Sequence, residues 1–299
     1  MTWLHAFELI CYLIVAMLLV HLVRMRSTRE LFCFGAAALV GFVMELLAVS
    51  VTDIYTYNPS FWLSIGIAPK QFPVFGGLMW GGLTVMAIRL AKRLQLPRLQ
   101  TALATGIFIV SMDILLDVVA IRLDGGFWTW EGRPINLDID QHMFMSVIWI
   151  NFLGYLIETP TVCFLTLRAE NRIDQKDLSG QTRTALVTAL VAILVTAAGS
   201  GIALGLNWLT DDWFACIAFV SLWLTITARI VTRAHELRLR PCRPTPATAT
   251  EALFWIMLYA YCLAALAHLG IAKARPTLLV AGLVFAGFTT WLSLTPPTE

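Results

Sequence analysis

The sequence is short of charged residues. Asp, Glu, Lys and Arg make up 13% of its 299 residues, and 59% of the residues are hydrophobic. A soluble domain is about a quarter charged and roughly half apolar. The composition therefore excludes an ordinary soluble domain and indicates a membrane protein. The net charge of +2 is too small to suggest a nucleic acid as a partner.

The six cysteines form no Cys-x-x-Cys pair, and five of them lie within apolar segments. The sequence therefore predicts neither a disulfide framework nor a zinc site. The first apolar segment lacks the basic start that is typical of a signal peptide, and it is long enough to cross a bilayer. We interpret it as a membrane helix.

Nine apolar stretches have the length of about 17 to 25 residues that a membrane-spanning helix needs. They lie near residues 3–23, 31–52, 73–91, 101–121, 143–167, 184–206, 213–231, 252–272 and 277–294. The sequence therefore predicts an all-α, polytopic membrane protein of about nine helices, with eight as the alternative count. Because acidic side chains are concentrated in the first five helices, we expect a polar-core segment at 1–175 that holds the active site. An apolar segment is expected at 183–299.

Lys and Arg are distributed unevenly among the connecting loops. The first, third, fifth and seventh loops contain 16 of the 21 basic residues, among them Lys176 of the fifth loop. Loops rich in Lys and Arg stay in the cytoplasm. The prediction is a multi-pass protein of the cell (inner) membrane, with its N-terminus outside and its C-terminus in the cytoplasm.

Two acids, Asp113 and Asp117, lie four residues apart in an otherwise apolar run. At the helical period they share one face, and an acid within a bilayer is costly unless it is paired, protonated or exposed to water. A rise of about 1.5 Å per residue places Glu45, Trp80 and Asn151 in the same outer part of the membrane. The pattern predicts one site in the first five helices that opens outward.

Aromatic pairs follow two of these helices. Tyr55 and Tyr57 come after the second helix, and Trp128 and Trp130 come after the fourth. Such residues form interfacial belts without any catalytic role. Glycines border the tryptophan pair, however, and would permit a tight return of the chain. A lid or a pocket wall is therefore an equally good interpretation of Trp128 and Trp130.

Glu158 lies seven residues after Asn151 and so shares its helical face. It precedes Pro160, which cannot donate to the carbonyl of Leu156 and should kink the helix. Two interpretations stay open for Glu158. It is either an acid that gates or conducts protons, or a protonated group hydrogen-bonded to the freed backbone.

Protonated carboxyls in an apolar chamber with aromatic walls suit acid catalysis on an alkene. Burial disfavours the charged form of a carboxyl, so the group keeps a proton that it can donate. Aromatic faces attract the cation that forms. Capture of that cation by water would hydrate an isoprenoid, and capture by an internal double bond would cyclise it. Neither reaction needs a metal or an organic cofactor.

A set of short motifs follows the same order along residues 35–165. They are Gly41-x-x-x-Glu45, Tyr55-x-Tyr57, Pro73 with Trp80, Asp113-x-x-x-Asp117, Trp128-x-Trp130-x-Gly132 and Asn151-Phe152-x-Gly154. In this order they resemble the multi-pass carotenoid biosynthesis family that includes bacterial gamma-carotene hydratases and haloarchaeal bisanhydrobacterioruberin hydratases. The resemblance implies addition of water to the terminal C1–C2 double bond of a linear carotenoid end group. The chain departs from that family at Val118, at Tyr155 and in an insertion at 136–142.

These observations lead to one set of site residues. Asp117 or Glu45 is predicted to donate the proton, while Asp113 and Asn151 position water. The expected substrate-binding residues are Tyr55, Tyr57, Trp80, Trp128, Trp130, Asn151 and Glu158. The expected partners are a lipophilic carotenoid or other isoprenoid and the lipid bilayer, with other carotenoid-pathway enzymes as further candidates.

Two other classes stay open. An intramembrane prenyltransferase would need a second aspartate-rich motif with cations for a diphosphate, and the only candidate is Asp211-Asp212, which has no Arg or Lys beside it. A proton-coupled transporter could use Glu45, Asp113, Asp117 and Glu158 as a relay. Inverted repeats would be expected of such a transporter, and the sequence shows no convincing internal repeat.

Overall fold

The structure is a computed structural model that describes residues 1–173 and 177–296. Lys176 and the last residues of the predicted segments 1–175 and 183–299 lie outside these ranges. The described helices are α1 (Trp3–Arg24), α2 (Thr28–Val51), α3 (Val74–Lys92), α4 (Arg98–Ala120), α5 (Trp149–Ile173), α6 (Leu178–Leu209), α7 (Trp213–Glu236), α8 (Pro246–His268), α9 (Ile271–Ala274) and α10 (Pro276–Ser293). Nine of the described helices, all except α9, are long and apolar enough to cross a membrane. The predicted all-α polytopic fold is confirmed.

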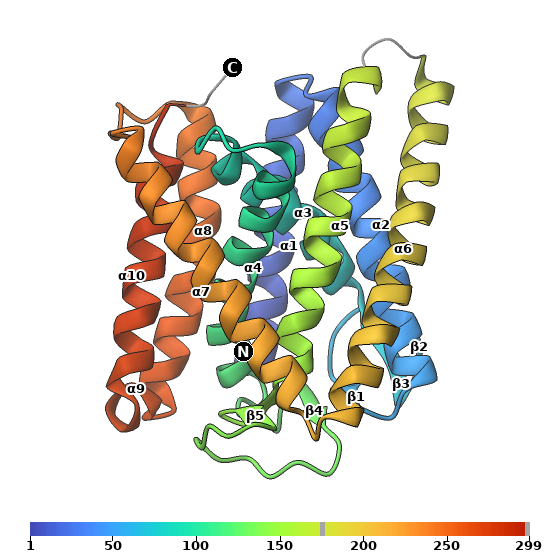
Figure 1. Cartoon of the computed structure of the whole chain (residues 1–299), viewed down its shortest axis with the longest axis vertical. Helices are drawn as coiled ribbons and strands as arrows, with labels where there is room; N and C mark the ends of the chain where they lie inside the picture. Colours follow the sequence, from blue (N-terminus) through green and yellow to red (C-terminus); the bar gives the residue numbers. More distant parts are fainter. Residues whose placement is uncertain (174–176, 297–299) are drawn as a thin grey trace.

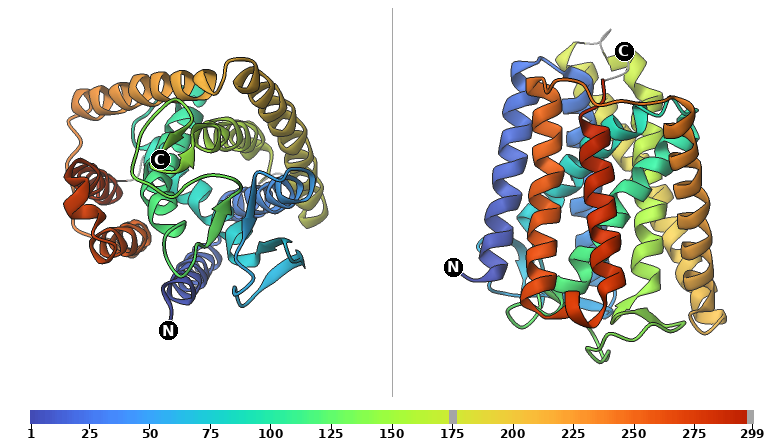
Figure 2. Two further views of the ribbon diagram at one scale, coloured as in Figure 1. Left: turned by 90° about the horizontal axis from the view of Figure 1, so that it is seen from below. Right: turned by 90° about the vertical axis from the view of Figure 1, so that its left-hand side faces the viewer.

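Short strands connect the helices at one end of the bundle (Figure 1). They are β1 (Tyr55–Tyr57), β2 (Ser64–Ile67), β3 (Lys70–Pro73), β4 (Trp128–Trp130), β5 (Met143–Phe144) and β6 (Val147–Ile148). Each forms one antiparallel pair, β1 with β4, β2 with β3 and β5 with β6. The chain starts at this same end (Figure 2). The strands therefore lie at the end that was predicted to be outside.

The fifth helix starts later than predicted. Residues 143–148 form the β5–β6 hairpin instead, and Met145 and Ser146 at its turn have positive φ angles of 50° and 70°. Two positive φ angles are what a tight two-residue hairpin turn requires. Asn151 consequently lies in the first turn of α5, although the sequence predicted it to lie eight residues inside the helix.

The helices differ in how deeply they are buried. α4 lies in the middle of the bundle, whereas α6 and α7 lie along its edge (Figure 2). Leu186, Leu190 and Leu194 recur every fourth residue on α6, and all three are exposed. Spacing of this kind presents one apolar face to the surroundings. In a bilayer that face contacts lipid, which fits a multi-pass membrane protein.

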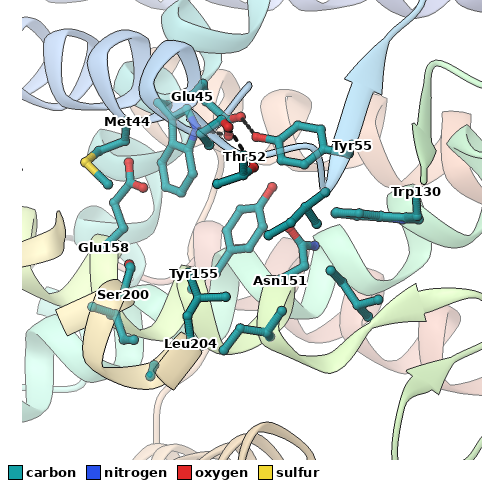
Figure 3. Close-up of a pocket in the computed structure, with 18 residues that line it drawn as sticks. Met44, Glu45, Thr52, Tyr55, Trp130, Asn151, Tyr155, Glu158, Ser200 and Leu204 are labelled. Carbon is teal, nitrogen blue, oxygen red and sulfur yellow. Dashed lines mark hydrogen bonds between the residues drawn. The ribbon is translucent and has the colours of Figure 1, made fainter. Parts of the chain in front are cut away.

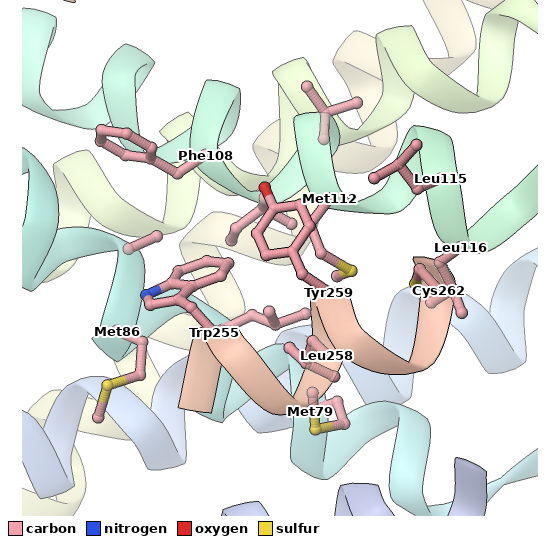
Figure 4. Close-up of a cluster of buried hydrophobic side chains, with 14 of the residues drawn as sticks. Met79, Met86, Phe108, Met112, Leu115, Leu116, Trp255, Leu258, Tyr259 and Cys262 are labelled. Carbon is pink, nitrogen blue, oxygen red and sulfur yellow. The ribbon is translucent and has the colours of Figure 1, made fainter. Parts of the chain in front are cut away.

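α8 is held against α3 and α4 by large apolar side chains. Trp255, Leu258 and Tyr259 of α8 are buried and meet Met86 of α3 and Met112 of α4 (Figure 4). Between helices inside a bilayer, where lipid is as apolar as these side chains, close van der Waals packing of this kind holds the helices together. This packing encloses the inner side of α4, where the acidic pair lies.

A buried arginine ties the other end of the bundle together. Arg93, only 1% exposed, donates to the carbonyls of Ser293 and Thr295 at the end of α10. Its guanidinium also lies 2.7 Å from Glu251 of α8. Arg89, one turn earlier, binds Glu30 of α2 through two nitrogens, at 2.6 and 2.7 Å. The basic end of α3 therefore anchors α2, α8 and α10.

Candidate active site

The β1–β4 ribbon joins the two aromatic loops. Tyr55 pairs with Trp130, and Tyr57 pairs with Trp128. Directly opposed residues of an antiparallel pair share a face, and so do residues two apart along a strand. All four aromatic side chains therefore point to one side of the ribbon, which is the side of the acids on α2 and α4. This register explains the Tyr-x-Tyr and Trp-x-Trp spacing.

Glu45, near the end of α2, receives three hydrogen bonds. The Tyr55 and Tyr57 hydroxyls donate to its Oε2 at 2.5 and 3.0 Å, and the Trp80 indole N–H approaches Oε1 at 3.4 Å. Burial, and after it the nearby Glu45, raises the pKa of both Tyr55 and Tyr57 above the usual value of about 10. Both phenols are therefore protonated donors.

Close packing of α2 on α3 places Trp80. A Cβ at Gly41 would lie 2.4 Å from the Trp80 ring, so only glycine lets the indole lie against α2. Glu45 follows one turn later on the same face. In the Gly-x-x-x-Glu motif, Gly41 thus leaves space for the indole, and Glu45 supplies the carboxyl that the indole N–H approaches. On its other side, the Trp80 ring stacks on Tyr155, with centroids 5.0 Å apart.

The acidic pair of α4 meets a polar pair of α5. Asn151 donates to Oδ2 of Asp117 at 2.6 Å, and the Tyr155 hydroxyl donates to Oδ1 of Asp113 at 3.1 Å. Both pairs have a spacing of four residues, so they match along two neighbouring helices. Tyr155 was not among the predicted site residues. It was noted only as a departure from the family pattern, although its hydroxyl belongs to this network.

Three neighbouring cavities lie on the strand side of the bundle. The central cavity, about 170 Å³, lies among α2, α5 and α6 (Figure 3). Its lining includes Met44, Glu45, Thr52, Tyr55, Trp80, Trp130, Asn151, Gly154, Tyr155, Glu158, Ser200, Ala203 and Leu204. The α6 residues were missed in the sequence, where the only available signal was the run of small residues from Gly199 to Gly201. Small residues allow helices to pack closely in membranes.

The aromatic cavity, about 70 Å³, lies on the other side of the Trp80–Tyr155 stack. Its lining includes Phe7, Glu45, Tyr57, Phe72, Phe75, Trp80, Asp113, Trp128 and Tyr155. Glu45, Trp80 and Tyr155 line both the central and the aromatic cavity and form the wall between them. Asp117 lines neither cavity, but its partner Asn151 lines the central one.

The polar cavity, about 320 Å³, lies nearer the end of the bundle where the strands are. It is lined by Asp53, Ile54, Trp130, Glu131, Arg133, His142, Ile148, Trp149, Ile150, Leu204, Asn207, Trp208 and Asp212. Five of these residues also line the central cavity, namely Ile54, Trp130, Ile148, Ile150 and Leu204. The two cavities are therefore neighbours. Asp212 is 2.8 Å from His142 and belongs to this cavity, away from the acidic pair of α4.

Among the residues that the structure describes, the carboxyls of the site have no cationic partner. Within residues 1–173 and 177–296, neither the central nor the aromatic cavity is lined by Lys, Arg or His. The same part of the chain also contains no group of three or more His, Cys, Asp or Glu side chains suited to a metal ion. The arrangement therefore consists of acids, hydroxyls and aromatic rings.

Comparison with known proteins gives a match to one protein family. A family model described as carotenoid biosynthesis protein matches residues 6–226, from α1 into α7. No curated protein and no solved structure matches the chain. The matched range contains every residue that lines the central and polar cavities.

Proposed function

The chain belongs to the carotenoid biosynthesis protein family, and we propose that it adds water across the terminal double bond of a linear carotenoid end group. A role in carotenoid biosynthesis and a lipophilic carotenoid substrate follow from the family. The proposal of hydration rests on one observation above all. Glu45, held by three donors, shares an aromatic-walled cavity with a second carboxyl and with no cationic side chain among the described residues.

The end group occupies the central cavity in this proposal. Its walls at Met44, Ile157 and Leu204 are apolar, and they come from three membrane-spanning helices. A hydrocarbon chain can therefore extend from the cavity without leaving an apolar environment. The rings of Trp80 and Trp130 face the cation that protonation would create, and aromatic faces stabilise such a charge.

Glu45 acts as the base in this reaction. Hydrogen bonds from Tyr55, Tyr57 and Trp80 favour its ionised form, because each donor stabilises the negative charge. Oε1 is the freer oxygen, since the Trp80 contact at 3.4 Å is longer than a usual N–H···O bond. Oε1 accepts the proton of the attacking water.

Asp113 and Asp117 act through their α5 partners. Asp117 orients the Asn151 amide, which lines the central cavity and positions the water. Asp113 fixes the Tyr155 hydroxyl and with it the ring that stacks on Trp80. The predicted catalytic set of Asp117, Glu45 and Asp113 then divides into one base and two groups that position other residues.

Water enters from the polar cavity. Its charged lining adjoins the central cavity at Ile148 and Ile150, so the apolar end group and the water arrive from different sides. With the basic loops in the cytoplasm, as proposed from their charge, the polar cavity opens toward the opposite aqueous side.

Expression in a host that accumulates lycopene or gamma-carotene tests the proposal. The pigments made by the wild type, Asp117→Asn and Glu45→Gln are separated by chromatography, and their masses are measured by mass spectrometry. We expect a product heavier by one water molecule that is lost or strongly reduced in both variants. A product of unchanged mass but altered retention would indicate cyclisation instead. A folded wild-type protein that makes no new pigment would refute the carotenoid substrate.

A further inference from the structure

Glu158 lies in the middle of α5 and lines the central cavity. It is 8% exposed, and its Oε1 has no hydrogen-bond partner among the described residues. Glu158 shares a helical face with Asn151 and Gly154, which line the same cavity. Its side chain extends from α5 toward α2, on the side of Met44 and Glu45 (Figure 3). An unpartnered carboxyl oxygen therefore lies where the end group would bind.

The surroundings of Glu158 favour a protonated carboxyl. It lies nine residues beyond the start of α5, about 13 Å along the helix. A carboxylate at such depth is costly unless it is paired. The described lining of the cavity contains no cation, and the other acid in it, Glu45, is the one that receives hydrogen bonds from Tyr55, Tyr57 and Trp80. Two negative charges in one small apolar space would repel each other.

The other acids of the site are less suited to give a proton to the end group. Glu45 is surrounded by donors that favour its anion. Asp117 lines neither the central nor the aromatic cavity. Asp113 also has an unpartnered oxygen, but it lines only the aromatic cavity, beyond the Trp80–Tyr155 stack. Glu158 is the remaining acid with an unpartnered oxygen in the central cavity.

We propose that Glu158 is the acid that protonates the terminal double bond, an inference that rests on the proposed hydration. The O–H bond of Glu158 breaks, the alkene electron pair forms a C–H bond at C2, and a tertiary cation remains at C1. A water oxygen bonds to C1, and Oε1 of Glu45 takes the released proton. A water in the shared cavity then carries that proton from Glu45 back to Glu158. The sum is alkene plus water giving the tertiary alcohol.

The test compares Glu158→Gln with the wild type in membranes supplied with the carotenoid that the wild type converts. Glutamine keeps the size and polarity of the side chain but cannot donate an acidic proton. We expect the hydration rate to fall by about 100-fold or more, the usual contribution of a general acid. The matched control is Glu170→Gln, the same substitution on α5 at a residue that pairs with Lys92 away from the cavity. It should keep the wild-type rate.

A second variant and a labelled solvent complete the design. Glu158→Met, an apolar side chain of similar length, should be as inactive as Glu158→Gln, so the test holds if the amide disturbs folding. In D₂O the wild-type product should carry one non-exchangeable deuterium at C2. A general acid contributes far more than about twofold to a rate. If a folded Glu158→Gln or Glu158→Met variant stays within about twofold of the wild-type rate, Glu158 is not the acid, and the proposed hydration still stands. A wild type without any hydrated product would overturn both.

Discussion

Replacing Tyr55 or Tyr57 by phenylalanine removes one donor from Glu45 and keeps the ring. The two hydroxyls reach Oε2 at 2.5 and 3.0 Å, and a hydrogen bond to a charged group contributes about 1.5–3 kcal/mol. Ionising Glu45 should become costlier by that amount. Since 1.36 kcal/mol corresponds to a factor of ten, each variant should lose about 10- to 150-fold in kcat/KM. The β1–β4 pairing uses the backbone and should persist.

The assay measures initial hydration rates in liposomes that contain the carotenoid, with product mass as the readout. Tyr12→Phe is the matched control, because Tyr12 also donates to a carboxyl, that of Glu8, but lines none of the three cavities. It should keep the wild-type rate. Raising the pH should partly restore the Tyr55→Phe and Tyr57→Phe variants, because higher pH returns the carboxylate form of Glu45. In the wild type, the raised pKa of both phenols keeps them protonated at these pH values.

One result would refute this reasoning. If Glu45 were the proton donor, losing groups that stabilise its anion would leave the rate unchanged or increase it. A Tyr55→Phe variant as active as the wild type, with normal folding, would therefore remove Glu45 from the role of base.

Two further predictions concern the cavity and the buried ion pair. A Cβ at Gly154 meets nothing within 4 Å, so Gly154→Ala should raise the free energy of unfolding by about 0.5–1 kcal/mol. Gly154→Leu should fill the central cavity and abolish hydration without lowering the melting temperature in detergent. An active Gly154→Leu variant would contradict binding in this cavity. Arg93→Met removes the nearer partner of the buried Glu251, at 2.7 Å, and leaves Arg89 at 3.3 Å. The free energy of unfolding should fall by about 3 kcal/mol, the lower end of the range for breaking a buried ion pair. The Lys70→Met variant, which breaks the pair between the half-buried Lys70 and the exposed Asp53, should melt as the wild type does. Equal melting of the Arg93 and Lys70 variants would refute a role for burial.

The helices and the meeting of the polar residues could be predicted from the sequence. Apolar length locates a membrane helix, and helical period with rise per residue gives the face and depth of a side chain. These rules placed Glu45 and Trp80 at one depth and put the deeper Glu158 on the helical face of Asn151, and all four line the central cavity, although α5 starts later than predicted. Such rules need only local sequence, which is why they succeed without knowledge of tertiary contacts.

The contacts that organise the site could not be predicted in this way. The β1–β4 ribbon consists of three-residue strands from distant loops, and its register depends on how the helices are arranged. The α6 wall at Ser200 and Leu204 has no acidic or aromatic signal, since an apolar wall resembles any lipid-facing stretch. Residues from both predicted segments therefore line the cavities, including Leu258 of α8 in the aromatic cavity.

The ribbon brings together parts of the chain that a ribosome completes at different times. Thr56 and Glu131, hydrogen-bonded across it, are 75 residues apart. Because synthesis proceeds from the N-terminus, α2 enters the membrane before the tryptophan pair exists, and α6 completes the wall later still. Glu45 and the α4 acids must therefore cross into the bilayer before their enclosure is built. Both helices are apolar enough to span a membrane, which supplies the drive for insertion, and their burial follows during assembly.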